Sequence, residues 1–370
     1  MNADKASGLI KFNIEKQNTN TPRSLKLLKT LDNQQIKKIM VRSTNWVGDA
    51  VMTTPAMGAL RAAFPDAEIV VVANPLVAEL FTHHPYCNRV LVYDTKGPHK
   101  GFRGLWRFSR VLRRERFDLA ILLQNAIEAA LMAFLAGVPR RAGYRTDARG
   151  PLLTHGVPVG KAEKQLHHTD YYRQMLNRIG LAGGDGRLRL ECREEELAWA
   201  RRELGPGDWV AVNPGAAYGS AKRWFPERFA ETADRLVEEY GVKIVLTGGP
   251  GEKEIGNDIA AAMAAQPLNL IGRTSVRQLM AVLASVRLLV SNDSGPMHVG
   301  AAFGVPIVAV FGPTDHTTTS PLADNCRIVR KDVGCAPCLL RQCPTDHRCM
   351  KAITAEDVLS AARELLGERL

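Results

Sequence analysis

The 370-residue chain is predicted to be an α/β protein with two doubly wound, Rossmann-like domains. Short apolar strands alternate with amphipathic helical segments, which indicates βαβ crossovers and parallel sheets. This alternation weakens over residues 145–195 and then starts again. The chain is also longer than one ordinary domain of ~100–200 residues.

The first series of elements begins at Ile39 and alternates up to about residue 137. Its strands are β-branched and apolar, which is typical of a sheet covered on both faces. A further helix is expected over residues 170–180. The predicted strands are 39–43, 68–74, 89–94 and 118–125, and the predicted helices are 52–64, 101–116 and 126–137, with a short helix after residue 74.

The second series repeats the pattern and ends in a helix that opens with Thr354 and Asp357, a start resembling a capping box. Its predicted strands are 209–215, 242–249, 268–272, 287–293 and 306–312, and its predicted helices are 226–240, 252–264, 275–285 and 294–303. The expected parts are a mobile extension (1–37), an N-terminal domain (38–185), a C-terminal domain (186–353) with a Cys-rich loop (334–349), and a last helix (354–370).

Composition narrows the class of protein further. Hydrophobic residues make up 45% and charged residues 24% of the chain, which is ordinary globular usage. No run approaches the ~18–20 apolar residues of a membrane span, and the first 20 residues lack a signal-peptide pattern, so a cytosolic protein is expected. The formal net charge of +11 favours an anionic partner, such as a nucleic acid, an acidic membrane surface or a phosphorylated substrate.

The segment "SNDSGPMHVGAAFG" (291–304) carries the strongest local signal. A buried strand ends before Asp293, and a helix is expected to begin at Ser294 and Gly295. The free N–H groups and the dipole of a helix start suit a diphosphate, and His298 lies one turn further along. The alternative is that Asp293 only caps the helix and His298 only packs in it.

Two further loops follow predicted strands in the second series. In "NPGAAYGSAKRWFPERF" (213–229), Lys222 could stabilise a leaving diphosphate, or the loop could simply be solvated. In "TGGPGEKE" (247–254), Glu252 could bind a ribose hydroxyl, or could only complement the helix dipole. Neither domain has a G-x-G-x-x-G motif after its first strand, which argues against a nicotinamide or flavin enzyme.

In the first domain, the loop "TNWVGDAVMTTPA" (44–56) places Asp49 directly after the first strand. Ligands of doubly wound sheets bind beyond the carboxyl ends of the strands, and two such domains facing each other would form a cleft between them. A carboxylate there could take a proton from an acceptor hydroxyl. The alternative is that Asp49 is a helix cap.

A basic stripe is predicted on the helix over residues 101–116. Its arginines recur at spacings of four, three and four, so they share one face, while Leu105, Phe108 and Leu112 lie on another face that can be buried. The stripe could meet an anionic acceptor or membrane, or could be a solvated face. Its members are Arg103, Arg107, Arg110 and Arg114.

Four of the seven cysteines crowd into the segment C-x2-C-x4-C-x5-C. Four thiolates at such short spacings can enclose a tetrahedral zinc ion, although the spacing is irregular. The alternative is a reduced or redox-labile loop. The residues concerned are Cys335, Cys338, Cys343 and Cys349.

Taken together, three motifs resemble the ADP-heptose:lipopolysaccharide heptosyltransferases of glycosyltransferase family 9. They are "STNWVGDAVMTTPA", "NPGAAYGSAKRWF" and "NDSGPMHVGAAFG", in this order and spacing, and the resemblance covers roughly residues 38–365. It implies the GT-B architecture, in which two Rossmann-like domains face each other across a cleft.

The resemblance also implies residue roles. Asp49 matches the catalytic base, and Lys222 matches the lysine that binds the diphosphate. Glu252 falls near the ribose-binding glutamate. The Asp-Ser-Gly-x-x-His donor motif matches Asp293, Ser294, Gly295 and His298. The tail and the four-cysteine loop depart from the better-known members of the family.

The implied reaction is inverting transfer of heptose from ADP-L-glycero-β-D-manno-heptose to the lipopolysaccharide inner core. It takes no cofactor and requires no metal. The resemblance is strongest to members that add heptose to a heptose already on Kdo2-lipid A, which act at the cytoplasmic face of the inner membrane.

Three other functions are weighed against this one. A sister enzyme of the same family, acting directly on Kdo or later in the core, would share all three motifs. A zinc-bearing nucleic-acid-binding protein would use the positive charge and the cysteines, but Phe102, Trp106 and Phe108 fit an apolar helix face equally well, so no nucleic-acid partner is expected. A dehydrogenase-type epimerase would need G-x-G-x-x-G and Tyr-x-x-x-Lys, and neither is present.

Overall fold

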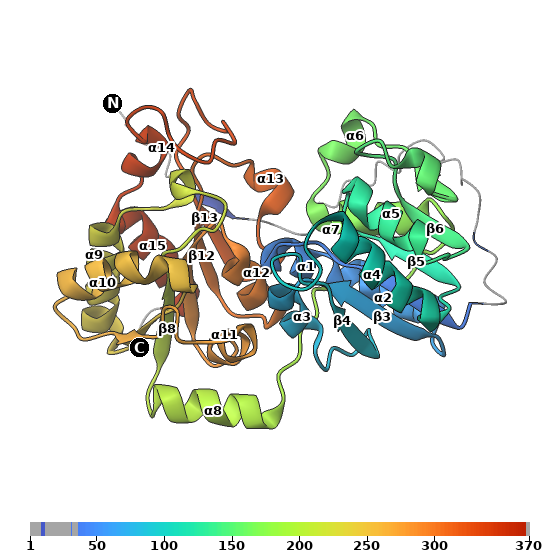
Figure 1. Ribbon diagram of the computed structural model, residues 1–370. Helices are drawn as coiled ribbons and strands as arrows, with labels where there is room; N and C mark the ends of the chain where they lie inside the picture. The colour runs from blue at the N-terminus through green and yellow to red at the C-terminus, as the bar shows by residue number, and fades with distance from the viewer. Residues whose placement is uncertain (1–8, 12–30, 32–35, 368–370) are drawn as a thin grey trace. The chain divides into compact units, whose positions relative to one another are not determined.

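The computed structural model describes residues 9–11, 31 and 36–367 (Figure 1). The chain divides into two compact units. The N-terminal unit is Asn18–Glu191, and the C-terminal unit is Cys192–Leu370 together with Met1–Gln17. No helix among the described residues is long and apolar enough to cross a membrane.

The sheet of the N-terminal unit has six parallel strands in the order β4-β3-β2-β5-β6-β7. Counted along the unit, this is the Rossmann order 3-2-1-4-5-6, and it places the first and fourth strands, β2 and β5, side by side at the point where the winding reverses. The strands are β2 (Lys38–Arg42), β3 (Glu68–Ala73), β4 (Arg89–Val92), β5 (Leu119–Leu122), β6 (Arg140–Tyr144) and β7 (His155–Val157).

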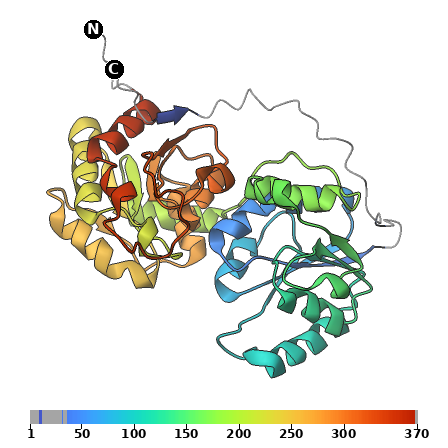
Figure 2. The same cartoon turned by 90° about the horizontal axis from the view of Figure 1, so that it is seen from above.

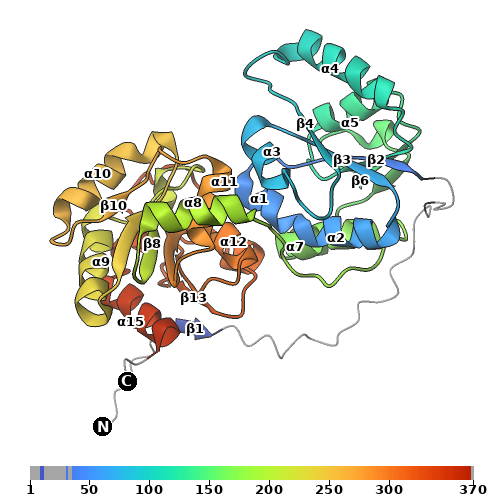
Figure 3. The same cartoon turned by 90° about the horizontal axis from the view of Figure 1, so that it is seen from below.

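Helices cover both faces of this sheet. Leu105, Phe108 and Leu112 of α4 pack with α5 residues onto one face, in the spacing that the sequence predicts. Helices α2 and α7 pack together on the other side of the sheet (Figure 3). The helices are α1 (Val47–Met52), α2 (Thr54–Ala63), α3 (Pro75–Phe81), α4 (Gly101–Glu115), α5 (Ile127–Leu135), α6 (Lys161–Lys164) and α7 (His168–Asn177).

The sheet of the C-terminal unit has the order β1-β13-β12-β11-β8-β9-β10. Without β1, this is again the order 3-2-1-4-5-6, with β8 and β11 as central neighbours. The strands are β8 (Trp209–Asn213), β9 (Lys243–Leu246), β10 (Leu268–Asn269), β11 (Leu288–Asn292), β12 (Ile307–Val310) and β13 (Cys326–Val329). The first strand, β1 (Leu9–Lys11), pairs antiparallel with β13 and is the dark blue arrow in Figure 2.

The core of the C-terminal unit lies between this sheet and three helices. Side chains of α9, α10 and α15 pack on the strands around the buried Trp224, which is a core residue as the sequence indicates. Helix α8 packs against α11 (Figure 3). The helices are α8 (Glu194–Leu204), α9 (Pro226–Tyr240), α10 (Lys253–Ala262), α11 (Val276–Leu283), α12 (Gly295–Ala302), α13 (His316–Thr319), α14 (Arg348–Lys351) and α15 (Ala355–Leu366).

Several sequence predictions are confirmed in detail. Helix α9 begins at Pro226, and Thr354 and Asp357 form a capping box at α15. The strand-helix alternation is present in both units.

The structure also corrects the sequence analysis. The helix predicted over residues 52–64 is α2, and a separate short helix, α1, lies in the stretch predicted to be a loop. Thr53 separates the two helices, and its hydroxyl donates to the carbonyl of Ala50 at 2.6 Å. Helix α8 is not among the predicted helices, since it begins in the charged stretch where the alternation weakens. Strands β6, β7 and β13 had no clear sequence signal, since they are short and contain Arg, His or Gly.

Most of the expected mobile extension over residues 1–37 lies outside the described residues. Where it is described, it takes part in the fold. β1 joins the C-terminal sheet, and Leu31 and Ile36 are buried.

Candidate active site

The carboxyl edge of the C-terminal sheet is built around two buried asparagines at the ends of β8 and β11. Asn292 donates to the carbonyl of Pro214 at 2.7 Å and accepts the N–H of Trp224 at 3.1 Å. Asn213 donates to the carbonyl of Thr247 and accepts the hydroxyl of Ser294 at 3.0 Å. These side chains tie the loop after β8 to the strand ends where ligands of this fold bind.

Lys222 and Asp293 meet at this edge. The Nζ atom of Lys222, in the short 3-10 helix Ser220–Lys222, lies 2.6 Å from Oδ2 of Asp293. The hydroxyl of Thr314 donates to the same oxygen at 2.5 Å, and the Lys222 ammonium lies 5.0 Å from the ring centroid of Tyr218. The carboxylate is nearly fully buried, so the cation and its partner are held in one geometry.

The start of α12 lies beside this pair. Ser294 is the N-cap, and no side chain caps the helix, because the Ser294 hydroxyl donates to Asn213 instead. The alternative that Asp293 caps this helix is therefore wrong. Gly295 is the first helical residue, and His298 is buried one turn further on. The uncapped N–H groups and the helix dipole favour an anion at this point.

Glu252 lies over the loop after β8. Its carboxylate accepts the N–H of Gly249 at 2.7 Å, which completes the start of the short helix Pro250–Glu252. A Cβ atom added to Gly215 would come within 1.9 Å of this carboxylate, so glycine is required there. Glu252 is therefore a local cap, and its carboxylate also lies beside the loop that follows β8.

The Cys-rich loop packs on the segment that carries Lys222. The carbonyl of Arg341 accepts the N–H of Ala221 at 3.1 Å, and the ring of His347 contacts the carbonyl of Ala221 at 2.7 Å. Tyr218 donates to the carbonyl of Leu339 at 2.8 Å. The loop thus supports the segment that leads up to the lysine.

The structure does not assemble the four cysteines of this loop into a metal site. Among the described residues, which include the whole loop, no three or more His, Cys, Asp or Glu side chains are grouped as metal ligands. Cys335 and Cys338 are exposed, Cys343 is half-buried and Cys349 is buried, and all are free thiols. The possible zinc site is therefore not supported by this geometry.

Asp49 lies in the first turn of α1, at the carboxyl edge of the N-terminal sheet and beside the switch between β2 and β5. The loop before it is held by Arg42, a buried arginine that donates to the carbonyl of Ser43 at 2.8 Å and to Oδ1 of Asn45 at 3.2 Å. Burial lowers the pKa of Arg42 to about 10, so it is still a cation at neutral pH. The alternative that Asp49 is a helix cap is wrong, since Trp46 is the N-cap of α1.

The four arginines of the predicted stripe lie on the exposed face of α4. Two aromatic side chains, for which the sequence left open an apolar helix face or a ligand-stacking role, are exposed beside them, Phe102 at 67% and Trp106 at 49%. Arg110 lies over the ring of Trp106 at 4.9 Å. This face therefore combines cations with exposed aromatic rings.

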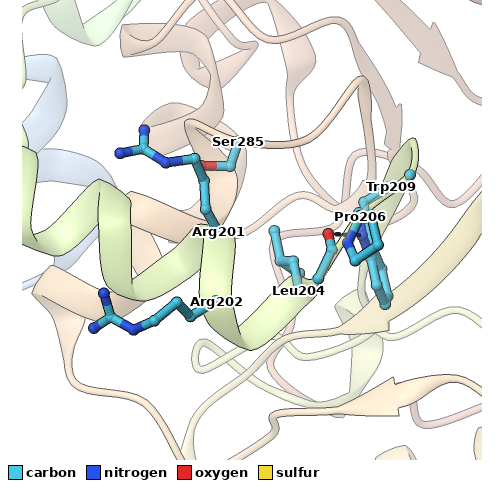
Figure 4. Close-up of a pocket in the computed structure, with 8 residues that line it drawn as sticks. Arg201, Arg202, Leu204, Pro206, Trp209 and Ser285 are labelled. Carbon is cyan, nitrogen blue, oxygen red and sulfur yellow. Dashed lines mark hydrogen bonds between the residues drawn. The ribbon is translucent and has the colours of Figure 1, made fainter.

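A separate pocket of about 390 Å³ lies at the opposite end of the C-terminal sheet (Figure 4). It is bordered by the end of α8, including Arg201 and Arg202, and by Trp209 at the start of β8. None of the sequence-predicted site residues lines it.

Sequence reasoning missed several residues at the carboxyl edges of the two sheets. Asn213 and Asn292 had a signal, because a polar amide at the end of an apolar strand in "VNPG" and "SND" is unusual. Thr314, Tyr218 and His168 had none, because their positions depend on crossovers between distant segments. His168 is the first residue of α7 and lies beside Asp49.

Comparison with known proteins gives consistent matches. The family described as Glycosyltransferase family 9 (heptosyltransferase) matches residues 105–348. Lipopolysaccharide heptosyltransferase 2 of Salmonella typhimurium is 30% identical, over 90% of this chain and 99% of the relative.

Two solved structures are also similar. The E. coli ADP-heptose LPS heptosyltransferase II is 30% identical with a TM-score of 0.75, over 89% of this chain and 98% of the other. A family 9 glycosyltransferase from Veillonella parvula is 28% identical with a TM-score of 0.82, over 91% and 98% of the two chains.

Proposed function

The chain belongs to glycosyltransferase family 9, the heptosyltransferases, and we propose that it transfers L-glycero-D-manno-heptose from ADP-heptose to the inner core of lipopolysaccharide. Its two Rossmann-like units are those of a GT-B glycosyltransferase. The observation that carries the proposal is the Lys222–Asp293 pair beside the uncapped start of α12, at the switch point of the C-terminal sheet.

This edge suits the diphosphate of the donor. Lys222 supplies a cation, the N–H groups at Ser294 and Gly295 supply donors, and His298 lies in the same helix. Asp293 keeps the lysine in place. Glu252 has carboxylate oxygens that can accept ribose hydroxyls, and its position over Gly215 puts them at the end of β8.

In the proposed reaction, the acceptor hydroxyl attacks the anomeric carbon of heptose while Asp49 takes its proton. The new bond joins the acceptor oxygen to the anomeric carbon, and the bond from that carbon to the β-phosphate oxygen breaks. ADP leaves with the electron pair, and Lys222 and the start of α12 stabilise the developing negative charge. No step calls for a cofactor or a metal.

The transition state is expected to have oxocarbenium character, as in other glycosyl chemistry. The proposed donor-binding residues belong to the C-terminal unit, and the proposed base belongs to the N-terminal unit.

The proposed acceptor is heptose-Kdo2-lipid A, as for the second lipopolysaccharide heptosyltransferase. The relative and the solved structure that are 30% identical both carry this designation. An acceptor ending in Kdo, or a later core sugar, is the alternative within the family.

The exposed face of α4 is the proposed contact with the acceptor and the cytoplasmic leaflet of the inner membrane. Its four arginines can pair with carboxylates and phosphates, and each cation near an anionic surface contributes about 1 kcal/mol. Phe102 and Trp106 add apolar surface on the same face, which is typical of helices that lie in a membrane interface.

Incubation of the purified protein with ADP-heptose and defined core acceptors, followed by mass spectrometry, tests the proposal. Transfer of one heptose to heptose-Kdo2-lipid A is expected. Transfer to Kdo2-lipid A alone would establish the alternative acceptor, and absence of transfer to every core acceptor would overturn the proposal.

A further inference from the structure

His168 lies against the proposed base. Its Nδ1 atom is 3.6 Å from Oδ1 of Asp49, across the contact between α7 and α1. This is just beyond hydrogen-bond range, and contacts of catalytic groups are often this long before substrates are bound and tighten in the reactive complex.

We propose that His168 is a positioning residue for Asp49. Its Nδ1–H donates to one carboxylate oxygen and holds the group in orientation, so that the second oxygen is left to accept the proton of the acceptor hydroxyl. This inference rests on the proposed role of Asp49 as the base.

Two features of the His168 ring support this arrangement. Its Nδ1 atom is buried, although the side chain as a whole is 40% exposed, so this nitrogen faces the protein on the side where Asp49 lies. Apart from the Asp49 contact, Nδ1 has no hydrogen-bond partner within the part of the chain that the structure describes. A buried ring N–H needs an acceptor, and the Asp49 carboxylate is placed to supply it.

The first turn of α7 is anchored to the strand ends of the same sheet, which fixes where His168 lies. Tyr144, at the end of β6, donates to the carbonyl of Tyr171 at 2.6 Å, and the two rings stack with centroids 4.2 Å apart. Asn125, just after β5, donates to the Tyr171 hydroxyl at 3.0 Å. His168 is therefore not on a free loop.

A buried arginine completes this anchor. The guanidinium of Arg149 donates to the carbonyls of Tyr144 and Gln124 and to Oδ1 of Asn125 at 2.9 Å. Its side chain is completely buried, and burial lowers its pKa to about 10, so it is charged at neutral pH. Such an arginine is costly to bury, and here its donors fix the residues that in turn hold α7.

Tyr172 lies one helical turn after His168 and is buried. Burial, and next the negative charge of Asp49, raise the pKa of Tyr172 well above its usual range. The phenol therefore stays protonated and neutral at the pH of the reaction. His168 and Tyr172, four residues apart, thus share one face of α7.

Three variants of His168 test the role of Nδ1. In His168→Asn the side-chain amide can take the place of Nδ1, in His168→Gln it takes the place of Nε2, and in His168→Ala no donor is left. We expect His168→Ala and His168→Gln to lower kcat by roughly 10- to 100-fold, as when a reacting group loses its orientation, with little change in KM for ADP-heptose. His168→Asn should recover most of the activity.

Coupling to Asp49 separates positioning from a structural role. The double variant Asp49→Asn, His168→Ala should be no slower than Asp49→Asn alone, because both changes remove the same function. The exposed Asp170→Asn, in the same turn of α7, is the control and should be unchanged. Additive losses, or equal losses in the three His168 variants, would overturn the proposal.

A measurement without substrates tests the role of His168 independently of the proposed function. The ¹⁵N chemical shifts of the His168 ring in the full chain, recorded above neutral pH, report which nitrogen carries the proton. We expect the Nδ1–H form, and a shift in Asp49→Asn. An Nε2–H ring that is unaffected by Asp49→Asn would overturn the role of His168, whatever reaction the protein catalyses.

Discussion

The ammonium group of Lys222 lies 2.6 Å from the carboxylate of Asp293, although 71 residues separate the two in the chain. Lys222 follows β8, Asp293 follows β11, and Thr314, which donates to the same carboxylate, follows β12. Three loops from three parallel strands therefore fix one cation. Its orientation is set before any ligand binds, which is the condition for effective stabilisation of a leaving diphosphate.

Removal of this cation should weaken binding of the donor. We expect Lys222→Ala and Lys222→Gln to reduce affinity for ADP by about 1.5–3 kcal/mol, the usual range for a hydrogen bond to a charged group. Isothermal titration calorimetry with ADP measures the change. Lys243→Gln, at the amino end of β9 in the same sheet, is the matched control. Unchanged ADP affinity in both Lys222 variants would show that the lysine does not contact the diphosphate.

Neutralisation of Asp49 should affect turnover rather than donor binding. Asp49→Asn keeps the shape of the side chain but cannot accept a proton, so kcat should fall by roughly 10²–10⁴-fold, the range for general-base catalysis. ADP-heptose binding, measured by calorimetry, should be unchanged. Asp66→Asn, an exposed carboxylate of the same unit, is the control. A kcat near that of the unmodified protein would remove Asp49 from the mechanism.

The exposed face of α4 should govern use of the acceptor. Replacement of Arg103, Arg107 and Arg110 by Gln should raise KM for the acceptor several-fold and reduce its dependence on salt, because screened charge attraction is lost. KM for ADP-heptose should not change.

The aromatic residues of the same face are tested separately. Phe102→Ser with Trp106→Ser should weaken sedimentation with vesicles that contain anionic lipid. Arg201→Gln with Arg202→Gln, on α8, is the control for the loss of charge.

The triple arginine variant of α4 has two outcomes that would contradict the prediction. Equal rises in KM for the acceptor and in KM for ADP-heptose would indicate a folding defect. Unchanged KM values would show that this face of α4 is only solvated.

Thiol labelling should separate the cysteines into two classes. Burial raises the pKa of Cys87 and of Cys326 to about 12, so neither forms much thiolate at pH 8. Cys335 and Cys338 are exposed and should react with iodoacetamide before Cys87 and Cys326, as peptide mapping by mass spectrometry would show. Protection of these two thiols that disappears after treatment with a chelator would contradict the arrangement of free thiols described here.

Glu115 should contribute to the pH dependence of stability. Hydrogen bonds from Arg89 at 2.7 Å and from Lys38 at 2.6 Å lower the pKa of Glu115 below its usual value. A carboxylate with a lowered pKa in the folded state adds stability above its unfolded pKa, and this stability is lost as the pH falls through the folded pKa. Because the groups are partly exposed, the contribution should be no more than about 1 kcal/mol.

Thermal melting between pH 5 and pH 3 measures this effect. Glu115→Gln should melt lower than the unmodified protein at pH 5, and the difference should shrink towards pH 3. Glu203→Gln, an exposed residue of α8, should leave the curve unchanged. A constant difference across this pH range would assign the effect to packing rather than to the ion pairs.

The sequence predicts some kinds of element more closely than others. Long amphipathic helices were predicted closely, and α9 has the predicted bounds of 226–240, because one helical face repeats every three to four residues. β7 has three residues and α8 lies in a charged stretch, so local composition gave little signal for either. The sequence did not decide whether Phe102 and Trp106 are buried, because an aromatic residue in a basic helix can lie on either face, and the structure shows both exposed.

The amino-acid sequence by itself determined the two strand-helix series, the glycine and polar residues at the strand ends, and the family, since each depends on neighbours in the chain or on motif spacing. Only the tertiary structure decided that Lys222 meets Asp293, that Glu252 lies over Gly215, and that His168 lies beside Asp49. The physical reason is the crossover connection. Parallel strands bring residues from distant segments to one edge of the sheet, and that meeting depends on strand order, which local propensity does not encode.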